Sequence, residues 1–167
     1  MQYYINAIFF FLTLSSVQCL FASDWELVKK NEKHDVVVYY RTLGSGYIEF
    51  KGVTHIKTSL NSFVSLFDDV ASMPEWVDRT IKGEKIEQMS DKEAYARSVN
   101  VMPFPFKNRD SILHSFIEQD INTFTVTIKG KSEATYRPEY ECCVRMTKVA
   151  SFWKFTPKSG GMVEVVF

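Results

Sequence analysis

Residues 122–129 read NTFTVTIK and show the pattern that decides the fold. Phe124, Val126 and Ile128 alternate with threonines, and because successive side chains of a β-strand point to opposite faces, this pattern predicts a half-buried strand with one apolar face. The chain from residue 82 onward has the same strand-like character almost throughout. We therefore expect further strands at about 83–89, 93–102, 110–119, 142–149, 151–156 and 162–167.

The first half of the chain mixes strands with helices. Residues 35–41 and 47–57 are rich in β-branched and aromatic residues and predict a hairpin. Apolar residues recur at helical spacing from Leu60 to Val70, which predicts a helix capped by Ser59, and Pro74 opens a short second helix.

The N-terminal part carries one further helix signal. Ser23 and Glu26 have the spacing of a capping box, which predicts a first helix through about Lys30. Helices followed by a long antiparallel meander indicate the α+β class, with the helices packed on one face of the sheet. A sheet this long twists, and it curls around whatever fills its concave face, a helix or a ligand.

The composition indicates one globular domain with no net charge. Lys and Arg total 20, as do Asp and Glu, so the formal net charge is zero. A nucleic-acid-binding protein normally shows a clustered basic excess, and we therefore expect no nucleic-acid partner. Hydrophobic residues make up 46% and aromatic residues 15% of the chain, which suits a large apolar core and an apolar cavity equally well.

Residues 1–22 contain no charged side chain and include the apolar run Ile8–Leu12. The apolar stretch is short for a transmembrane helix, which needs about 20 apolar residues. It predicts a secretory signal peptide cleaved near Ala22, and hence an exported protein, periplasmic or secreted, with one domain over residues 23–167. Because the first residues lack Lys and Arg, an uncleaved membrane anchor is the alternative.

Motifs that carry chemistry are absent from the sequence. Cys142 and Cys143 are adjacent, and since adjacent cysteines rarely bridge, we expect free or half-buried thiols on a strand. There is no CxxC, GxSxG, HExxH, Walker A or GxGxxG motif. His34, His55 and His114 are isolated in the sequence, so we expect no metal site, no cofactor and no catalytic residue.

One segment resembles a known family. Residues 103–110, PFPFKNRD, are similar to the PFP/PWP-x-x-x-RD signature of START domains, the lipid-transfer domains related to steroidogenic acute regulatory protein. Six other segments resemble the family in the same order: Trp25–Leu27, Val36–Arg41, Glu49–Gly52, Pro74–Trp76, Val144–Met146 and Ser151–Pro157. Asp35 stands where the first strand of the family usually has Gly. The resemblance covers residues 23–167 and is specific because the segments agree as an ordered set.

The resemblance implies a helix-grip (START/Bet v 1-like) fold. In this fold a curved antiparallel sheet with N-terminal helices is closed by a long C-terminal helix, and a lipid-sized tunnel lies between them. The sequence stops at Phe167, before the last strand and the gripping helix of the family, so we expect a fragment of a longer protein. Without that helix we expect five residues to be partly exposed: Phe124, Val126, Ile128, Trp153 and Phe155.

The candidate site follows from strand periodicity and from the resemblance. Residues 93, 95, 97 and 99 share one face of a strand, where a buried Arg97–Glu93 pair could anchor a polar head group or a sterol hydroxyl. START domains are similar in having a charged pair deep in an apolar tunnel. A surface pair on the convex face is the alternative, because one sequence does not fix which face is buried. The candidate lipid-binding residues are Glu93, Tyr95, Arg97, Val99, Phe124, Val126, Trp153 and Phe155. We interpret Arg109 and Asp110 as a structural corner with a local ion pair.

These observations predict non-enzymatic binding and transfer of a single lipid, phospholipid or sterol-like, with transient membrane contact. The alternative is an enzyme on the same scaffold, cyclase-like or hydrolase-like, acting on a hydrophobic small molecule. It would need acid and base groups that converge in the cavity, where Glu93 and Arg97 are the only candidates, and Arg does not act as a base at neutral pH. A lipid sensor that works with a protein partner is a third possibility.

Overall fold

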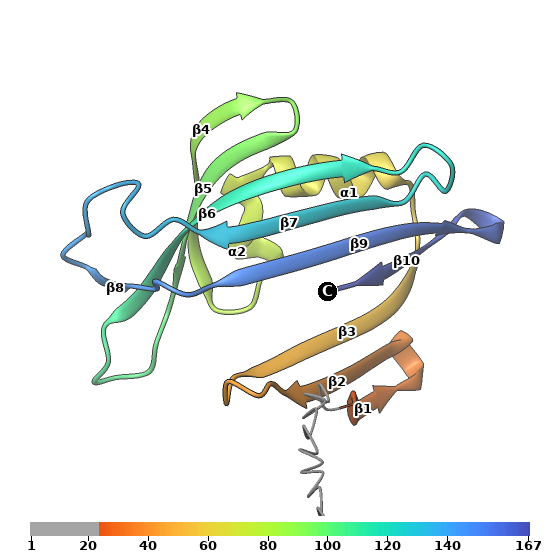
Figure 1. The fold of residues 1–167 in the computed structure, drawn as a ribbon, viewed down its shortest axis with the longest axis horizontal. Coiled ribbons are helices and arrows are strands. Elements are labelled where there is room, and N and C mark those ends of the chain that lie inside the picture. The colour runs from red at the N-terminus through yellow and green to blue at the C-terminus, as the bar shows by residue number, and fades with distance from the viewer. Residues whose placement is uncertain (1–23) are drawn as a thin grey trace, which may run out of the picture.

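The computed structural model describes residues 24–167 and contains one curved sheet with helices on one side (Figure 1). Nine strands follow the order β1-β2-β3-β10-β9-β7-β6-β5-β4, and β8 pairs with β6 beside this path. All pairings are antiparallel except the short parallel one between β6 and β8. The α+β class and the curved antiparallel sheet are thereby confirmed.

The strands are β1 (Glu26–Asn31), β2 (Val36–Thr42), β3 (Ile48–Lys57), β4 (Thr80–Ser90), β5 (Glu93–Asn100), β6 (Asn108–Gln119), β7 (Val126–Ser132), β8 (Cys143–Arg145), β9 (Ala150–Lys158) and β10 (Met162–Val166). The α-helices are α1 (Leu60–Asp68) and α2 (Met73–Trp76), and three short 3-10 turns are η1 (Glu32–His34), η2 (Val70–Ser72) and η3 (Ser159–Gly161).

The predicted first helix is wrong. Residues 26–31 form strand β1, which pairs with β2 from Glu26 opposite Tyr40 to Asn31 opposite Val36. A capping box satisfies only the first backbone donors of a helix, whereas the edge of β2 offers hydrogen bonds along a whole strand. The tertiary pairing therefore overrides the local helix signal.

Two predicted strands differ from the expectation: β7 is displaced toward the C-terminus and ends at Ser132, and β8 is much shorter. The strand expected at 122–129 begins only at Val126, because the Asp120 carboxylate accepts hydrogen bonds from the backbone N–H groups of Asn122 and Thr123 and folds the preceding residues into a turn. Phe124 lies in this turn with a positive φ of 54°, outside the sheet. The strand expected at 142–149 is reduced to the three residues of β8.

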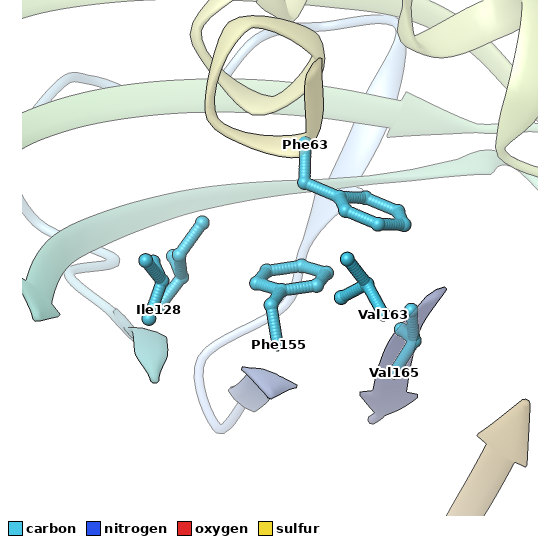
Figure 2. Packing of buried hydrophobic residues seen from close by; sticks show 6 residues of the cluster. Phe63, Ile128, Phe155, Val163 and Val165 are labelled. Carbon is cyan, nitrogen blue, oxygen red and sulfur yellow. The ribbon is translucent and has the colours of Figure 1, made fainter. Parts of the chain in front are cut away.

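Helix α1 covers the apolar centre of the sheet. The Ser59 side chain accepts a hydrogen bond from the backbone N–H of Ser62 and caps the helix as predicted. Phe63 points down onto Phe155, whose ring centroid lies 4.6 Å away, and the other buried members of the core surround this pair (Figure 2). The core consists of Phe63, Val126, Ile128, Phe155, Val163 and Val165.

The prediction that five residues at the sheet centre are partly exposed is therefore wrong for three of them. Val126, Ile128 and Phe155 are buried, because α1 packs directly on them. Trp153 is half-buried, and Phe124 is exposed for the separate reason that it lies in the turn before β7.

The core defines two faces of the sheet. Directly paired residues of neighbouring strands carry their side chains on the same face. The side of the core, facing α1, is called the helix face here, and the opposite side is called the outer face. The unbroken register from β5 through β6, β7 and β9 to β10 assigns each strand residue between β5 and β10 to one of them.

Residues 1–22 lie outside the described residues, so the signal peptide and the export of the protein stay predictions. Over residues 24–167, none of the helices has the length and apolar character needed to cross a membrane.

Candidate functional site

A small pocket lies between α1 and the helix face of the sheet. Its volume is about 150 Å³, with Val64 and Phe67 of α1 above and Ser115, Ile117 and Ile128 of the sheet below. A cavity of this size holds a group about as large as benzene. The pocket therefore suits one end of an apolar ligand. Its remaining lining residues are Asp68, Gln88, Asp91, Lys92, Glu93, Ala94 and Phe116.

A larger hollow of about 750 Å³ lies at the end of β6 and β7 and is lined mainly by polar side chains such as Glu118, Asp120 and Lys154. None of its lining residues is of an apolar type. We therefore place the candidate site in the smaller pocket, where apolar side chains of α1 and of the sheet face each other.

The helix face changes in character along the strands. Two neighbouring rows across the sheet are apolar, Val126–Phe155–Val165 and Ile117–Ile128–Trp153. The next row consists of small residues, Ala94–Ser115–Gly130–Ser151. The rows beyond it bring Ala96, Leu113 and Ser132 together, and then Ser98 and Ser111. Along the strands, the side chains of the helix face thus change from mainly apolar to mainly small or hydroxyl-bearing.

Gly130 makes room for two hydroxyl groups. A Cβ atom at this position would lie 2.6 Å from Ser151 Oγ and 3.4 Å from Ser115 Oγ. The two hydroxyls therefore converge over the glycine, on the face that forms the pocket floor. A side chain at position 130 would displace the Ser151 hydroxyl.

Aromatic rings border the apolar rows. The Phe67 ring lies 5.0 Å from Trp153 and 5.3 Å from Trp76 of α2, measured between centroids. The Trp76 indole Nε1 is buried and has no hydrogen-bond partner among the described residues. A buried donor without a partner is costly, so a ligand atom that accepted its hydrogen bond would be stabilised.

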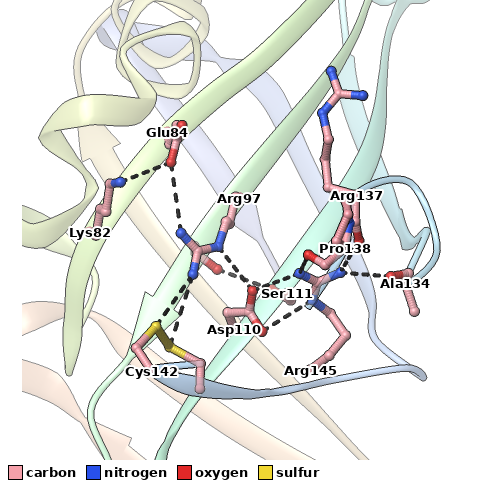
Figure 3. Close-up of polar contacts among 12 residues, drawn as sticks. Lys82, Glu84, Arg97, Asp110, Ser111, Ala134, Arg137, Pro138, Cys142 and Arg145 are labelled. Atoms are coloured by element: carbon pink, nitrogen blue, oxygen red, sulfur yellow. Dashed lines mark hydrogen bonds and ion pairs between the residues drawn. A yellow bond between two sulfur atoms is a disulfide. The ribbon is translucent and has the colours of Figure 1, made fainter. Parts of the chain in front are cut away.

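The predicted Arg97–Glu93 pair is wrong, because the two side chains have other partners. Arg97 Nε donates to Asp110 Oδ2 at 2.9 Å on the outer face (Figure 3). Glu93 Oε1 instead lies 2.6 Å from Nε2 of His114. Tyr95 stacks between His114 and Tyr136, with centroid distances of 4.2 and 3.8 Å.

Asp110 joins two buried arginines. Arg145 donates to both of its carboxylate oxygens at 3.1 and 3.0 Å, and Arg145 also binds the backbone carbonyls of Ala134, Arg137 and Pro138 (Figure 3). Arg97, Asp110 and Arg145 are 4%, 1% and 5% exposed. This network fastens the segment 134–145 onto the outer face, and it is structural.

Burial by itself would raise the pKa of the Asp110 carboxyl. The hydrogen bonds from Arg145 and Arg97, together with their charges, outweigh burial and hold this pKa below its ordinary value. Asp110 is therefore ionised at neutral pH. The local Arg109–Asp110 pair expected from the sequence is wrong, because Arg109 donates to the Lys107 carbonyl and Asp110 is occupied by Arg97 and Arg145.

The expectation of free thiols is also wrong. Cys142 and Cys143 form a disulfide, and their sulfurs lie 3.8 and 4.0 Å from Nη2 of Arg97. The turn that precedes β8 places both cysteine side chains next to the Arg97 guanidinium. The sequence alone does not predict that these residues meet.

The structure separates the predicted site residues into three groups. Val126, Trp153 and Phe155 lie on the helix face, while Glu93, Tyr95, Arg97 and Val99 have their side chains on the outer face, although Glu93 also borders the pocket. Phe124 lies in the exposed turn. The prediction that these β5 side chains face the cavity is thus wrong. Arg97 pairs with Ile112, and both side chains lie on the outer face, whereas Ser111 and Leu113 lie on the helix face.

Sequence reasoning missed Ser115, Ile117 and the α1 residues above them. Ser115 and Ile117 are two residues apart in the predicted strand 110–119 and therefore share a face. A search restricted to charged and aromatic residues passes over this pair. Among residues 24–167 no group of three or more His, Cys, Asp and Glu side chains is arranged to hold a metal ion.

The comparisons with known proteins identify relatives in sequence and structure. No protein-family model matches the sequence. The uncharacterized protein PA1579 of Pseudomonas aeruginosa is 31% identical over 147 residues, which are 87% of this chain and 71% of that protein.

Among solved structures, the STAR-related lipid transfer protein (fragment 25–204) from Xanthomonas axonopodis is similar with a TM-score of 0.78 and 26% identity, over 86% of this chain and 78% of that one. Human STARD10 is similar with a TM-score of 0.72 and 14% identity, over 85% of this chain and 58% of that one. The lipid transfer and protein localization domain of human StarD13 (DLC2) is similar with a TM-score of 0.70 and 14% identity, over 86% of this chain and 72% of that one.

Proposed function

This chain belongs to the START family of STAR-related lipid-transfer domains, and we propose that it binds a single lipid with one end in the pocket under α1. The observation that carries the proposal is the pocket itself, in which Val64 and Phe67 face Ile117 and Ile128 across about 150 Å³. Burial of apolar surface there gives about 25 cal/mol per Å².

The remainder of the lipid needs more apolar surface than the pocket provides. The helix face continues across β10 to β3, where Ile48, Phe50 and Ile56 are exposed along one strand. The exposed Phe167 ring lies over Gly52, between Phe50 and Ile56 in the strand. Contiguous exposed apolar residues of this kind mark binding surfaces in soluble proteins. An acyl chain or ring system that leaves the pocket would lie along this surface.

The proposed activity is binding and transfer without catalysis. Two of the pocket's titratable side chains already have partners: Asp68 pairs with Lys85, and Glu93 with His114. Acid–base catalysis requires groups that converge on one reacting atom. These pairings hold Asp68 and Glu93 away from such an arrangement, which supports the binding function over the enzymatic alternative.

Transient membrane contact is proposed for the turn between β6 and β7. Ile121 and Phe124 are 83% and 60% exposed there. This turn lies at the same end of the sheet as the pocket rim, where the Ile117 N–H donates to the Lys92 carbonyl. Apolar side chains at this end could enter a bilayer while a lipid passes into the pocket.

A pocket-filling substitution tests the proposal. Ala94→Leu places a larger side chain in the pocket lining, whereas Ala150→Leu makes the same change at an exposed outer-face position of β9. After incubation with vesicles of mixed lipids, native mass spectrometry measures the lipid retained by the purified chain. We expect Ala94→Leu to reduce retention about tenfold, or 1.4 kcal/mol, and Ala150→Leu to have no effect. Equal retention by both variants, with unchanged melting curves, would contradict the proposed site.

A further inference from the structure

We infer that the lipid taken up at this site is uncharged, with a hydroxyl or carbonyl group that hydrogen-bonds to Ser115 and Ser151; the inference rests on the proposed function. Neutral polar groups lie on the helix face beside the pocket, whereas the buried arginines lie on the outer face.

The neutral polar groups lie on the helix face. Ser115 lines the pocket beside Ile117 and Ile128. Ser151 lies outside the pocket lining, on the neighbouring strand, and its hydroxyl approaches that of Ser115 over Gly130. Neither serine hydroxyl has a hydrogen-bond partner among the described residues. A hydroxyl both donates and accepts, so each matches an alcohol or an ester carbonyl. Trp76 Nε1, the buried indole donor beside Phe67, is a neutral group as well.

The buried cations lie on the other side of the sheet. Arg97 and Arg145 lie on the outer face and both bind Asp110. The Arg145 guanidinium also binds three backbone carbonyls, and the Tyr140 ring centroid lies 3.6 Å from Arg97 Cζ. Neither is directed to the pocket. An ion in an apolar site is costly unless a charged partner meets it, so a phosphate at Ser115 would lack the partner it needs.

The rim of the pocket disfavours a phosphate as well. Its charged residues are Asp68, Asp91, Lys92 and Glu93, three acids and one base. Of these acids, Asp68 is paired with Lys85. The charges that remain are those of Asp91, Lys92 and Glu93, so an anionic head group at this mouth would meet more negative than positive charge, whereas an uncharged head group would not be repelled.

The inference is tested by competition between lipid classes. The purified chain is incubated with vesicles that contain equal amounts of phosphatidylcholine, phosphatidylglycerol, diacylglycerol and cholesterol, and the retained lipid is identified by mass spectrometry. We expect the two uncharged lipids to be retained about tenfold or more over the two phospholipids. Preferential retention of a phospholipid, lost in Ala94→Leu, would overturn this inference and leave the proposed function standing. Failure to retain any class would overturn the proposed function itself.

The serine contacts are tested by removing single hydroxyls. Ser115→Ala and Ser151→Ala should each lower the affinity for diacylglycerol by about three- to tenfold, the effect of one neutral hydrogen bond. Ser65→Ala, at an exposed position of α1, is the matched control and should leave it unchanged. Wild-type affinity in both Ser115→Ala and Ser151→Ala would overturn the assignment of these hydroxyls to the ligand.

Discussion

Asp110 is the residue on which the outer face depends most. Its carboxylate accepts from two buried guanidinium groups, and no other carboxylate contacts Arg145 among the described residues. Asp110→Asn removes the negative charge and leaves both arginines buried, which we expect to cost about 3–5 kcal/mol of unfolding free energy. For a chain of this size that corresponds to a fall in Tm of roughly 6–20 °C, measured by thermal unfolding at pH 7.

The matched control for this change is Asp78→Asn. The Asp78 side chain is 95% exposed, so its loss should alter stability by no more than about 0.5 kcal/mol. Because the folded-state pKa of Asp110 is lowered, its stabilising effect is present above the unfolded pKa of about 3.9 and is lost as the pH falls through the folded value. The difference between wild type and Asp110→Asn should therefore shrink below about pH 4. A constant difference down to pH 2 would contradict the role of the ionised carboxylate.

The β6–β7 turn is the element to which we assign membrane contact. The double variant Ile121→Ser/Phe124→Ser removes its two exposed apolar side chains, each of which can gain about 1.5–3 kcal/mol when fully buried in a membrane. We expect binding to phosphatidylcholine vesicles, measured by co-sedimentation, to fall about tenfold or more.

The control for this element lies at the other end of the sheet. Phe104 and Phe106, in the loop between β5 and β6, are 96% and 62% exposed. Phe104→Ser/Phe106→Ser deletes a similar amount of exposed apolar surface and should leave vesicle binding nearly unchanged. If this control loses binding and the β6–β7 variant does not, the membrane contact belongs to the opposite end of the molecule.

For the molecule as a whole, the proposed lipid should stabilise the fold. A ligand that binds only the folded state at 100 times its Kd adds about 2.7 kcal/mol, which raises the Tm of a domain of this size by roughly 5–10 °C. Differential scanning fluorimetry with diacylglycerol should show this shift for wild type and not for Ala94→Leu. The same shift in both variants would place the bound lipid away from the pocket.

Local patterns predicted the parts of the fold that depend on local forces. The 3.6-residue spacing from Leu60 to Val70 and the cap at Ser59 predicted α1, since both signals act within the helix itself. The alternation around Val126 and Ile128 predicted their strand, and the ordered resemblance to START domains predicted how the elements combine. Val126, Trp153 and Phe155 share the helix face with the pocket, but none of them lines it, so their predicted role in lipid binding stays a prediction.

The sequence by itself thus determined the class of fold, the main helix and which residues of a strand share a face. Only the tertiary structure decided which of the two faces meets α1, because a period of two is identical for both and the choice depends on pairing with distant strands. That choice put Arg97 with Asp110 on the outer face and Ser115 in the pocket. Pairing with the neighbouring strand β2 likewise decided that residues 26–31 form a strand, and long-range contacts decided that Cys142 and Cys143 meet at Arg97. Such contacts depend on residues outside the segment concerned, and the pattern within that segment does not record them.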